Sequence, residues 1–343
     1  MRDIFKIIFI IIGTIIGAGF ASGKEMYIFF FSYGLNGLFG ILISSILMGV
    51  IIYKSLIIIN KYNIVNYKDF LNIIVNIKFK NKYLNLKNIF NLIINIFILI
   101  TFFIMIAGFG AYFNQVFNLN IFIGSSILAF FCLIIFFGSI KRFVKINELL
   151  IPILIFLIII IGLFSLNNIN INNFLNINKN NSNNWILSSI IYCSYNSILL
   201  IPILISINNY LKNKKQIILI SIFSTIIIIF LSIILFFILA KIDCDISTLE
   251  MPIVYIISKI FVGFKYIYGF IIISSIFTTS ISLGISFLQN FIKNKNTYTH
   301  IAVIMCITSV IISQFGFSNL VNLLYPIFGV LGLIQILIIL HNK

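Results

Sequence analysis

Long apolar runs separated by short polar connections make up most of this chain. A helix needs about 20 residues to cross the hydrocarbon core of a bilayer, so each run of that length predicts one crossing. A shorter run at 252–261 predicts a re-entrant or surface helix. The pattern indicates an all-α integral membrane protein. The ten predicted crossings are residues 4–33, 35–59, 88–113, 119–140, 144–166, 185–206, 216–240, 264–291, 298–315 and 318–340.

The first apolar run is too long for one straight crossing and is interrupted by small residues at 17–23, Gly-Ala-Gly-Phe-Ala-Ser-Gly. Inside a bilayer, backbone groups released by such an interruption are tolerated only where they line a cavity or bind something. The interruption therefore predicts a binding site. The alternative is close helix packing, because Gly13 and Gly17, and likewise Gly19 and Gly23, have the spacing of a small-residue packing motif.

The crossings divide into two equal halves, 4–166 and 185–340, within a single transmembrane domain covering 1–343. Five crossings per half give the halves opposite orientations, as a five-plus-five inverted-repeat transporter requires. The sixth crossing should then be broken like the first. It contains Tyr195, Asn196 and Ser197 before Pro202, which removes a backbone donor. Helices 1 and 6 are both predicted to be discontinuous.

The charged residues lie mainly in the connections between the crossings, and their sign differs from one connection to the next. The chain is 61% hydrophobic and 9% charged, with a mean hydropathy of +1.19 and a net charge of +16. Its lysines and arginines occupy alternate connections instead of one patch, which argues against nucleic-acid binding. The opposite connections hold acids such as Asp243, Asp245 and Glu250. By the positive-inside rule, both termini are predicted to be cytoplasmic.

A cleaved signal peptide is the alternative interpretation of the N-terminus, since Arg2 and Lys6 precede an apolar run and small residues. The apolar pattern resumes directly after Lys24 and Glu25, however, which favours a membrane segment. Four scattered cysteines, with only Cys244 in a polar connection, predict neither a disulfide framework nor a metal site. The chain also lacks a credible set of nucleophile, base and orienting residue, so it is not expected to be an enzyme or to hold a cofactor.

The candidate substrate residues lie at the two interruptions and in the third crossing, where small residues leave room beside an aromatic ring. A broken helix presents free N–H groups to an anionic group of a substrate. Glu25, an ionisable residue at membrane depth, would contact a substrate amine or carry a proton; the alternative is a solvated position in the outer vestibule. The set is Gly17, Ala18, Gly19, Phe20, Ser22, Glu25, Gly108, Tyr112, Tyr195, Asn196 and Ser197.

A candidate sodium site combines the carbonyls of Gly13 and Ile16 with the hydroxyls of Thr278, Thr279 and Ser280 in the eighth crossing. Oxygen atoms of both kinds suit a small hard cation. The alternative is that these hydroxyls bond back to their own helix.

The stretch Gly13-Thr-Ile-Ile-Gly-Ala-Gly-Phe-Ala-Ser-Gly-Lys-Glu25 resembles the YkvI-like family of bacterial membrane proteins, and so do the Glu250-Met-Pro252 and Tyr325-Pro326 stretches. The likeness covers nearly the full chain. That family is similar to the amino acid-polyamine-organocation superfamily with its LeuT-like fold. The resemblance implies a five-plus-five fold in a bacterial cytoplasmic membrane, with substrate contacts at the first and sixth breaks.

We therefore expect a secondary active transporter of a small solute, an amino acid or related zwitterion, working by alternating access. Sodium is favoured over protons as coupling ion, because of the hydroxyl cluster and because the middle of the fifth crossing has no lysine. The alternative is a sensor of the same fold, of the spore-germinant receptor type, that binds a nutrient without net transport. The expected partners are the small solute and the lipid bilayer.

Overall fold

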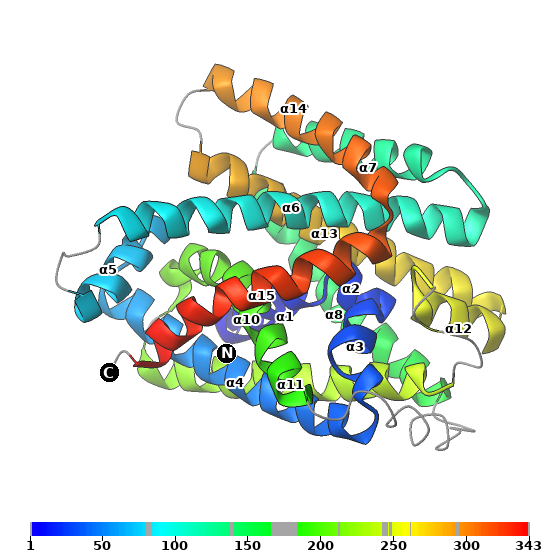
Figure 1. Cartoon of the computed structure of the whole chain (residues 1–343), viewed down its shortest axis with the longest axis horizontal. Coiled ribbons are helices and arrows are strands. Elements are labelled where there is room, and N and C mark those ends of the chain that lie inside the picture. Colours follow the sequence, from blue (N-terminus) through cyan, green and yellow to red (C-terminus); the bar gives the residue numbers. More distant parts are fainter. Residues whose placement is uncertain are drawn as a thin grey trace.

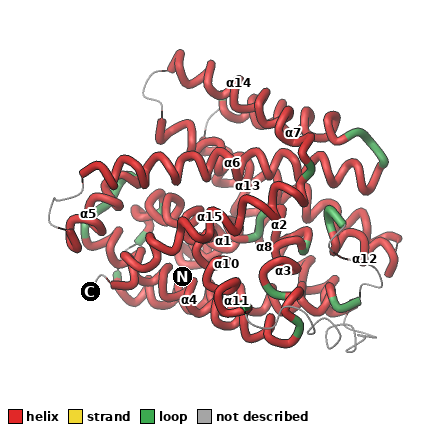
Figure 2. Tube along the Cα trace, viewed as in Figure 1, coloured by secondary structure: helices red, strands yellow, loops and turns green. Residues whose placement is uncertain are grey.

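A computed structural model describes residues 2–79, 84–137, 140–165, 184–211, 213–241, 246, 249–260, 262–291 and 295–341. Every regular element within these ranges is a helix (Figure 2). Residues 166–183, which connect the fifth and sixth predicted crossings, lie outside these ranges, and so does Cys244. The longer helices are α1 (Arg2–Ile15), α4 (Leu35–Lys61), α5 (Tyr67–Phe79), α6 (Leu84–Phe117), α7 (Ile121–Phe136), α8 (Ile140–Ser165), α10 (Trp185–Ser206), α11 (Lys214–Leu239), α12 (Pro252–Ile260), α13 (Val262–Phe291), α14 (Lys295–Ile312) and α15 (Phe317–His341).

Several of these helices have the length and composition of membrane spans. In the described ranges, seven are long and apolar enough to cross a bilayer, and shorter apolar helices cover 4–15, 121–136 and 151–164. Large apolar side chains such as Phe39, Phe130 and Leu337 point outward and are exposed. A soluble domain does not expose so much apolar surface, whereas lipid covers it in a membrane. The protein is a multi-pass membrane protein.

Helices from the two halves pack against each other in pairs. α4 lies on α11, α6 lies on α13, and α7 lies on α14. Figure 1 shows the α7–α14 pair on the far side of α6, with α4 and α11 along the opposite edge. α1 and α10 lie between these layers, α1 against α8 and α11, and α10 against α15 and α4. This arrangement places the first and sixth predicted crossings at the centre of the bundle.

Two short helices flank the bundle. α12 occupies the apolar piece for which a short non-spanning helix is predicted. α5 forms inside the connection between the second and third predicted crossings, where the apolar runs predict no element. Tyr67, Phe70, Leu71 and Ile74 are buried along one side of α5. Their spacing is that of an amphipathic helix, and α5 packs with this side toward α6, α15 and α10.

The sixth predicted crossing is not broken, so that prediction was wrong. α10 runs continuously from Trp185 to Ser206 and includes Pro202. Ser194 donates to the carbonyl of Ile190 and Ser197 to that of Ser194, so both hydroxyls bond back within the helix. A proline in a membrane helix is tolerated when neighbouring groups satisfy the released carbonyls. The polar residues of α10 therefore accompany an intact helix.

Candidate functional site

The first crossing is interrupted twice. α1 ends at Ile15, and the short helices α2 (Ala18–Ser22) and α3 (Lys24–Phe29) follow. Gly17 is extended, with φ −91° and ψ −171°, and its N–H bonds to the carbonyl of Ile15 at 2.8 Å. Gly23 joins α2 to α3 with φ +81°, a left-handed conformation that glycine adopts without steric cost. The chain thus changes direction at both ends of α2, deep inside the bundle.

α13 supplies hydroxyl groups to the carbonyls released by these interruptions. The Ser275 hydroxyl donates to the carbonyl of Ile16 at 2.5 Å, and the Tyr268 hydroxyl donates to that of Ala21 at 2.6 Å. The two residues are seven positions apart and so lie on one face of α13. Thr279 extends the same face by one turn, and its methyl group approaches Gly17. α13 therefore bridges the interruption from one side.

Most of the candidate sodium ligands are already engaged in contacts within the protein. The Ile16 carbonyl lies at the interruption but accepts from Ser275. Thr278 donates to the Ser275 carbonyl and Ser280 to that of Phe277, as in the back-bonding alternative. Gly13 lies against α8, where an added Cβ would come 2.1 Å from Ile151 Cδ1, which is a close packing contact. The sodium site stays a prediction, now narrowed to the neighbourhood of Thr279.

Thr279 differs from its neighbours in its hydrogen bonding. Its Oγ1 is buried and has no hydrogen-bond partner in the described part of the chain. A buried hydroxyl without a partner costs about 1–3 kcal/mol and calls for an explanation, such as an ion or a water. The unpartnered oxygen lies one turn from Ser275, beside Gly17. Among the predicted cation ligands, Thr279 is therefore the side chain with a free oxygen at the interruption.

Glu25 is buried on the other side of the interruption. Only 3% of its surface is exposed, which excludes the solvated position in an outer vestibule. The Tyr195 hydroxyl of α10 donates to Glu25 Oε2. The carboxyl also lies directly over Gly19, because a Cβ added to Gly19 would be 2.1 Å from Oε1. Glycine at 19 is what lets the carboxyl reach Tyr195.

Aromatic rings surround this carboxyl–tyrosine pair. Tyr195 stacks on Tyr325 of α15, with ring centroids 4.7 Å apart, and on Phe29 of α3, at 5.5 Å. Tyr192 meets the Tyr195 ring edge-on at 5.4 Å. We call Phe29, Tyr192, Tyr195 and Tyr325 the aromatic cluster. It joins α3, α10 and α15 into one closed contact next to Glu25.

The other predicted substrate residues contribute mainly packing. A Cβ on Gly108 of α6 would be 3.2 Å from the Cβ of Ala18, so Gly108 permits a close approach of α2. Tyr112, also on α6, places its hydroxyl against Gly269 of α13. Asn196 donates to the Tyr192 carbonyl at 3.1 Å within α10. Phe20 and Ser22 are buried in α2, and the Ser22 hydroxyl bonds back to the Gly19 carbonyl.

The search for site residues by sequence missed Ser275 as a partner of the interruption, as well as Tyr268, Tyr192 and Tyr325. The helical spacing of Tyr268, Ser275 and Thr279 could have indicated these partners, because it places three hydroxyls on one face of a predicted crossing. Nothing in the local sequence distinguishes Tyr192 and Tyr325 from other aromatic residues. Their role depends on the contact between α10 and α15.

Lys24, which precedes Glu25 in the chain, is a second buried ionisable side chain. It is 0% exposed, and its Nζ donates to the carbonyl of Leu249 at 3.0 Å, in the connection before α12. Side chains or backbone groups of α6 and α15 also bond to this connection before α12. Gln115 of α6 bonds both the N–H and the carbonyl of Met251, at 3.0 and 3.1 Å. Glu250 accepts from the N–H of Ser318 at the start of α15, at 2.6 Å.

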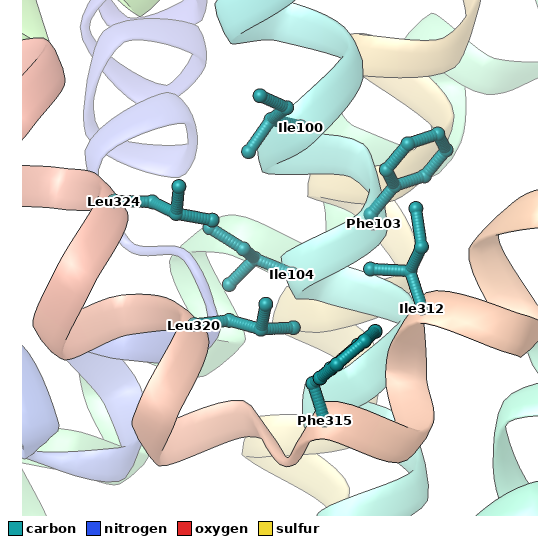
Figure 3. A pocket seen from close by; sticks show the side chains of 7 residues that line it. All are labelled: Ile100, Phe103, Ile104, Ile312, Phe315, Leu320 and Leu324. Carbon is teal, nitrogen blue, oxygen red and sulfur yellow. The ribbon is translucent and has the colours of Figure 1, made fainter.

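An apolar pocket of about 370 Å³ lies apart from the interruption, between α6 and the connection from α14 to α15 (Figure 3). All seven side chains that line it are hydrocarbon, including Phe103, Phe315 and Leu320. A polar solute would lose its hydration there without gaining a hydrogen bond. The pocket's chemistry fits an acyl chain better than the expected zwitterion, and we do not assign it to the candidate site.

Comparison with known proteins gives relatives without an assigned activity. No protein-family model matches the chain. The chain is 27% identical to the uncharacterized membrane protein YkvI of Bacillus subtilis, over 98% of this chain and 95% of that protein. It is 26% identical to the uncharacterized protein YyaD of the same organism, over 96% of this chain and 93% of that protein. The likeness to these proteins is thus of full length.

Solved structures identify the fold. Two mutant forms of the manganese transporter of Eremococcus coleocola superpose with a TM-score of 0.62 at 14% sequence identity. The match covers 98% of this chain and 78% of the transporter chain. The expectation that the chain is not an enzyme agrees with these relatives and neighbours. The chain is a multi-pass membrane protein with the fold of a membrane transporter.

Proposed function

We propose that the protein is a secondary active transporter that moves a small zwitterionic solute, an amino acid or a related compound, by alternating access. The observation that carries this proposal is the interruption of the first crossing at the centre of a transporter fold. Residues 16–25 bring backbone carbonyls and a buried carboxyl to the interruption, and α13 adds the unpartnered hydroxyl of Thr279 beside Gly17. The acceptor oxygens among these groups suit the ammonium group of a zwitterion.

A ten-crossing, five-plus-five inverted repeat is part of this proposal. The packing of the helices supports it, because contacts made in one half recur in the other. α1 packs on α8 as α10 packs on α15, and α1 packs on α11 as α10 packs on α4. α5 and α12, which lie in connections between predicted crossings, occupy the same place in the order of each half. One half moving against the other would open the central site to alternate sides.

Manganese is the competing substrate, because the structural neighbours are manganese transporters. Transition metals of this kind are bound by carboxylates, imidazoles and waters. Among the described residues, no group of three or more His, Cys, Asp or Glu side chains is placed to hold a metal ion. Glu25 is the one carboxyl at the interruption in the part of the chain that the structure describes, and it is bonded to Tyr195. The donor set favours an organic solute.

Coupling to a cation gradient completes the proposal, with sodium and protons as the candidates. Thr279, with its unpartnered Oγ1 beside Gly17, is the residue that supports a sodium site. Glu25 is the residue that supports protons.

A thermal-shift screen of the purified protein tests the function. The protein is heated with each of a panel of amino acids, with and without sodium, and with manganese as a separate arm. We expect an amino acid to raise the melting temperature, and Gly19→Leu to abolish that shift. Loss of sodium dependence in Thr279→Ala, with Thr278→Ala unchanged, would support the cation site.

Stabilisation by manganese alone would contradict the proposal. Reconstitution into proteoliposomes then separates transport from sensing, because a sensor binds the same amino acid without moving it across the membrane.

A further inference from the structure

Glu25 is enclosed by neutral groups. α3 packs on α2, on the turn Phe31–Tyr33, and on α10, α11 and α15. In the described part of the chain, the ionisable groups of the aromatic cluster beside the carboxyl are three phenols, those of Tyr192, Tyr195 and Tyr325. The other titratable residues of the surrounding elements are Lys24 and Tyr27 of α3, Tyr33 of the turn, Cys193 of α10, Lys214 and Lys215 of α11, and His341 of α15.

None of these residues neutralises the carboxyl. Tyr195 is its hydrogen-bond partner and is uncharged. Lys24 is adjacent in sequence, but its Nζ bonds to the Leu249 carbonyl at 3.0 Å and lies 5.9 Å from the centre of the Tyr27 ring. Lys214 and Lys215 begin α11, whereas the last turns of that helix, near Phe236 and Leu239, approach residues 23–37. Within the described residues, no cationic side chain pairs with Glu25.

Both oxygens of the carboxyl face protein groups in this closed state. Oε2 receives the Tyr195 hydroxyl directly, and Oε1 lies against the backbone of Gly19. The aromatic cluster closes the side toward α15. An isolated carboxylate in such surroundings is very costly, and a buried carboxyl in a membrane protein avoids that cost by binding a proton or pairing with a cation. Since no cationic side chain of the described residues pairs with Glu25, the geometry favours the proton.

We propose that Glu25 is protonated in this closed state and carries the proton whose movement drives transport. Oε2 accepts the hydrogen bond from Tyr195, and the proton resides on Oε1. When the site opens to one side, the carboxyl exchanges its proton with water there. It takes up one proton from the side of higher acidity and releases one on the other, so no further reactant is needed. This inference rests on the proposed transport function and names its coupling ion.

Infrared difference spectroscopy tests the protonation without any substrate. A protonated carboxylic acid has a C=O stretching band apart from that of a carboxylate, and the chain has only seven acidic side chains to assign. We expect the purified protein in neutral buffer to show a protonated-carboxyl band that Glu25→Gln removes. Glu250→Gln, at the partly exposed cap of α15, should leave it unchanged. Tyr195→Phe should shift the band, because the hydrogen bond to Oε2 is lost.

Absence of the band at neutral pH, or its persistence in Glu25→Gln, would overturn the inference even if the protein transports amino acids. A second measurement follows proton movement in proteoliposomes with an internal pH dye, using each amino acid that shifts the melting temperature. We expect solute-dependent acidification in the wild type, at least a tenfold loss of it in Glu25→Gln, and no such loss in Glu250→Gln. A band assigned to Glu25 without any solute flux would instead contradict the proposed function and leave the proton site standing.

Discussion

Two glycines in the same interruption have different roles. A Cβ on Gly17 would meet Met105 and Thr279 at 3.6 to 3.8 Å, which is ordinary van der Waals contact. A Cβ on Gly19 would fall 2.1 Å from Glu25 Oε1 and 2.6 Å from Cγ. Gly17 has an extended conformation that alanine also adopts. The smallest side chain is therefore needed at 19 and not at 17.

We predict that Gly19→Ala destabilises the protein by about 1–3 kcal/mol, because the methyl group displaces the Glu25 carboxyl from Tyr195. Gly17→Ala is the matched control and should change stability by less than about 1 kcal/mol. Thermal unfolding in detergent measures both variants. Equal effects of the two substitutions would contradict the placement of Glu25 over Gly19.

Ser275 and Ser282 provide a second matched pair, seven residues apart on α13. Ser275 donates to the Ile16 carbonyl of another helix, whereas Ser282 donates to the Thr278 carbonyl of its own. Ser275→Ala should cost about 1–3 kcal/mol, because it leaves a buried carbonyl without a partner.

Ser282→Ala should have little effect, because a helix carbonyl keeps its backbone bond when such a hydroxyl is removed. Chemical denaturation of the two variants in detergent compares them. If Ser282→Ala were the more damaging, α13 would not be holding the interruption as described.

At the scale of elements, the connection before α12 holds the ends of several helices together. Gln115 of α6 bonds both backbone groups of Met251, and Glu250 caps the first turn of α15. A carboxylate at a helix start satisfies a free N–H and interacts favourably with the helix dipole. Lys24 adds the link to α3 through the Leu249 carbonyl. Three consecutive residues thus connect three different helices.

Gln115→Ala should lower the free energy of unfolding by about 1–3 kcal/mol, because the N–H of Met251 loses its partner and the Met251 carbonyl keeps only the bond from the Tyr255 N–H. Gln314→Ala, on an exposed position of the turn Ser313–Phe315, is the control and should be close to neutral. Differential scanning fluorimetry compares the two variants. A neutral Gln115→Ala would show that this connection is not fixed to α6.

For the whole molecule, the orientation in the membrane follows from charge alone. The basic connections are predicted to be cytoplasmic, which places the connection containing Cys244 outside. The other three cysteines, Cys132, Cys193 and Cys306, are buried in the bundle. Only one thiol of the chain is therefore expected to react with a reagent that cannot cross the membrane.

We predict that a membrane-impermeant maleimide labels intact cells that produce the protein, and that Cys244→Ser removes this labelling. Labelling of a C-terminal cysteine added to the Cys244→Ser variant should require permeabilised cells. The opposite result, with the C-terminal thiol reacting first, would reverse the predicted topology.

The helical class, the approximate helix positions and the place of the interruption could be predicted from the sequence. Each of these features depends on local composition. The bilayer sets the length of an apolar run that spans it, and the small residues at 17–23 weaken a helix whatever its neighbours are. The same reasoning was wrong for α10, where Ser194, Ser197 and Pro202 occur without a break. Polar side chains in a membrane helix can donate hydrogen bonds to carbonyls of the same helix, so their presence alone does not indicate a break.

The sequence by itself therefore determined the membrane setting, the charge asymmetry and the first interruption, all of which are properties of neighbouring residues. Only the tertiary structure decided the partners at the interruption. Glu25 and Tyr195 are separated by 170 residues, and Ser275 and Ile16 by 259. Which hydroxyl reaches which carbonyl depends on how α3, α10 and α13 pack, since contacts of this kind arise only when distant helices are brought to the same depth.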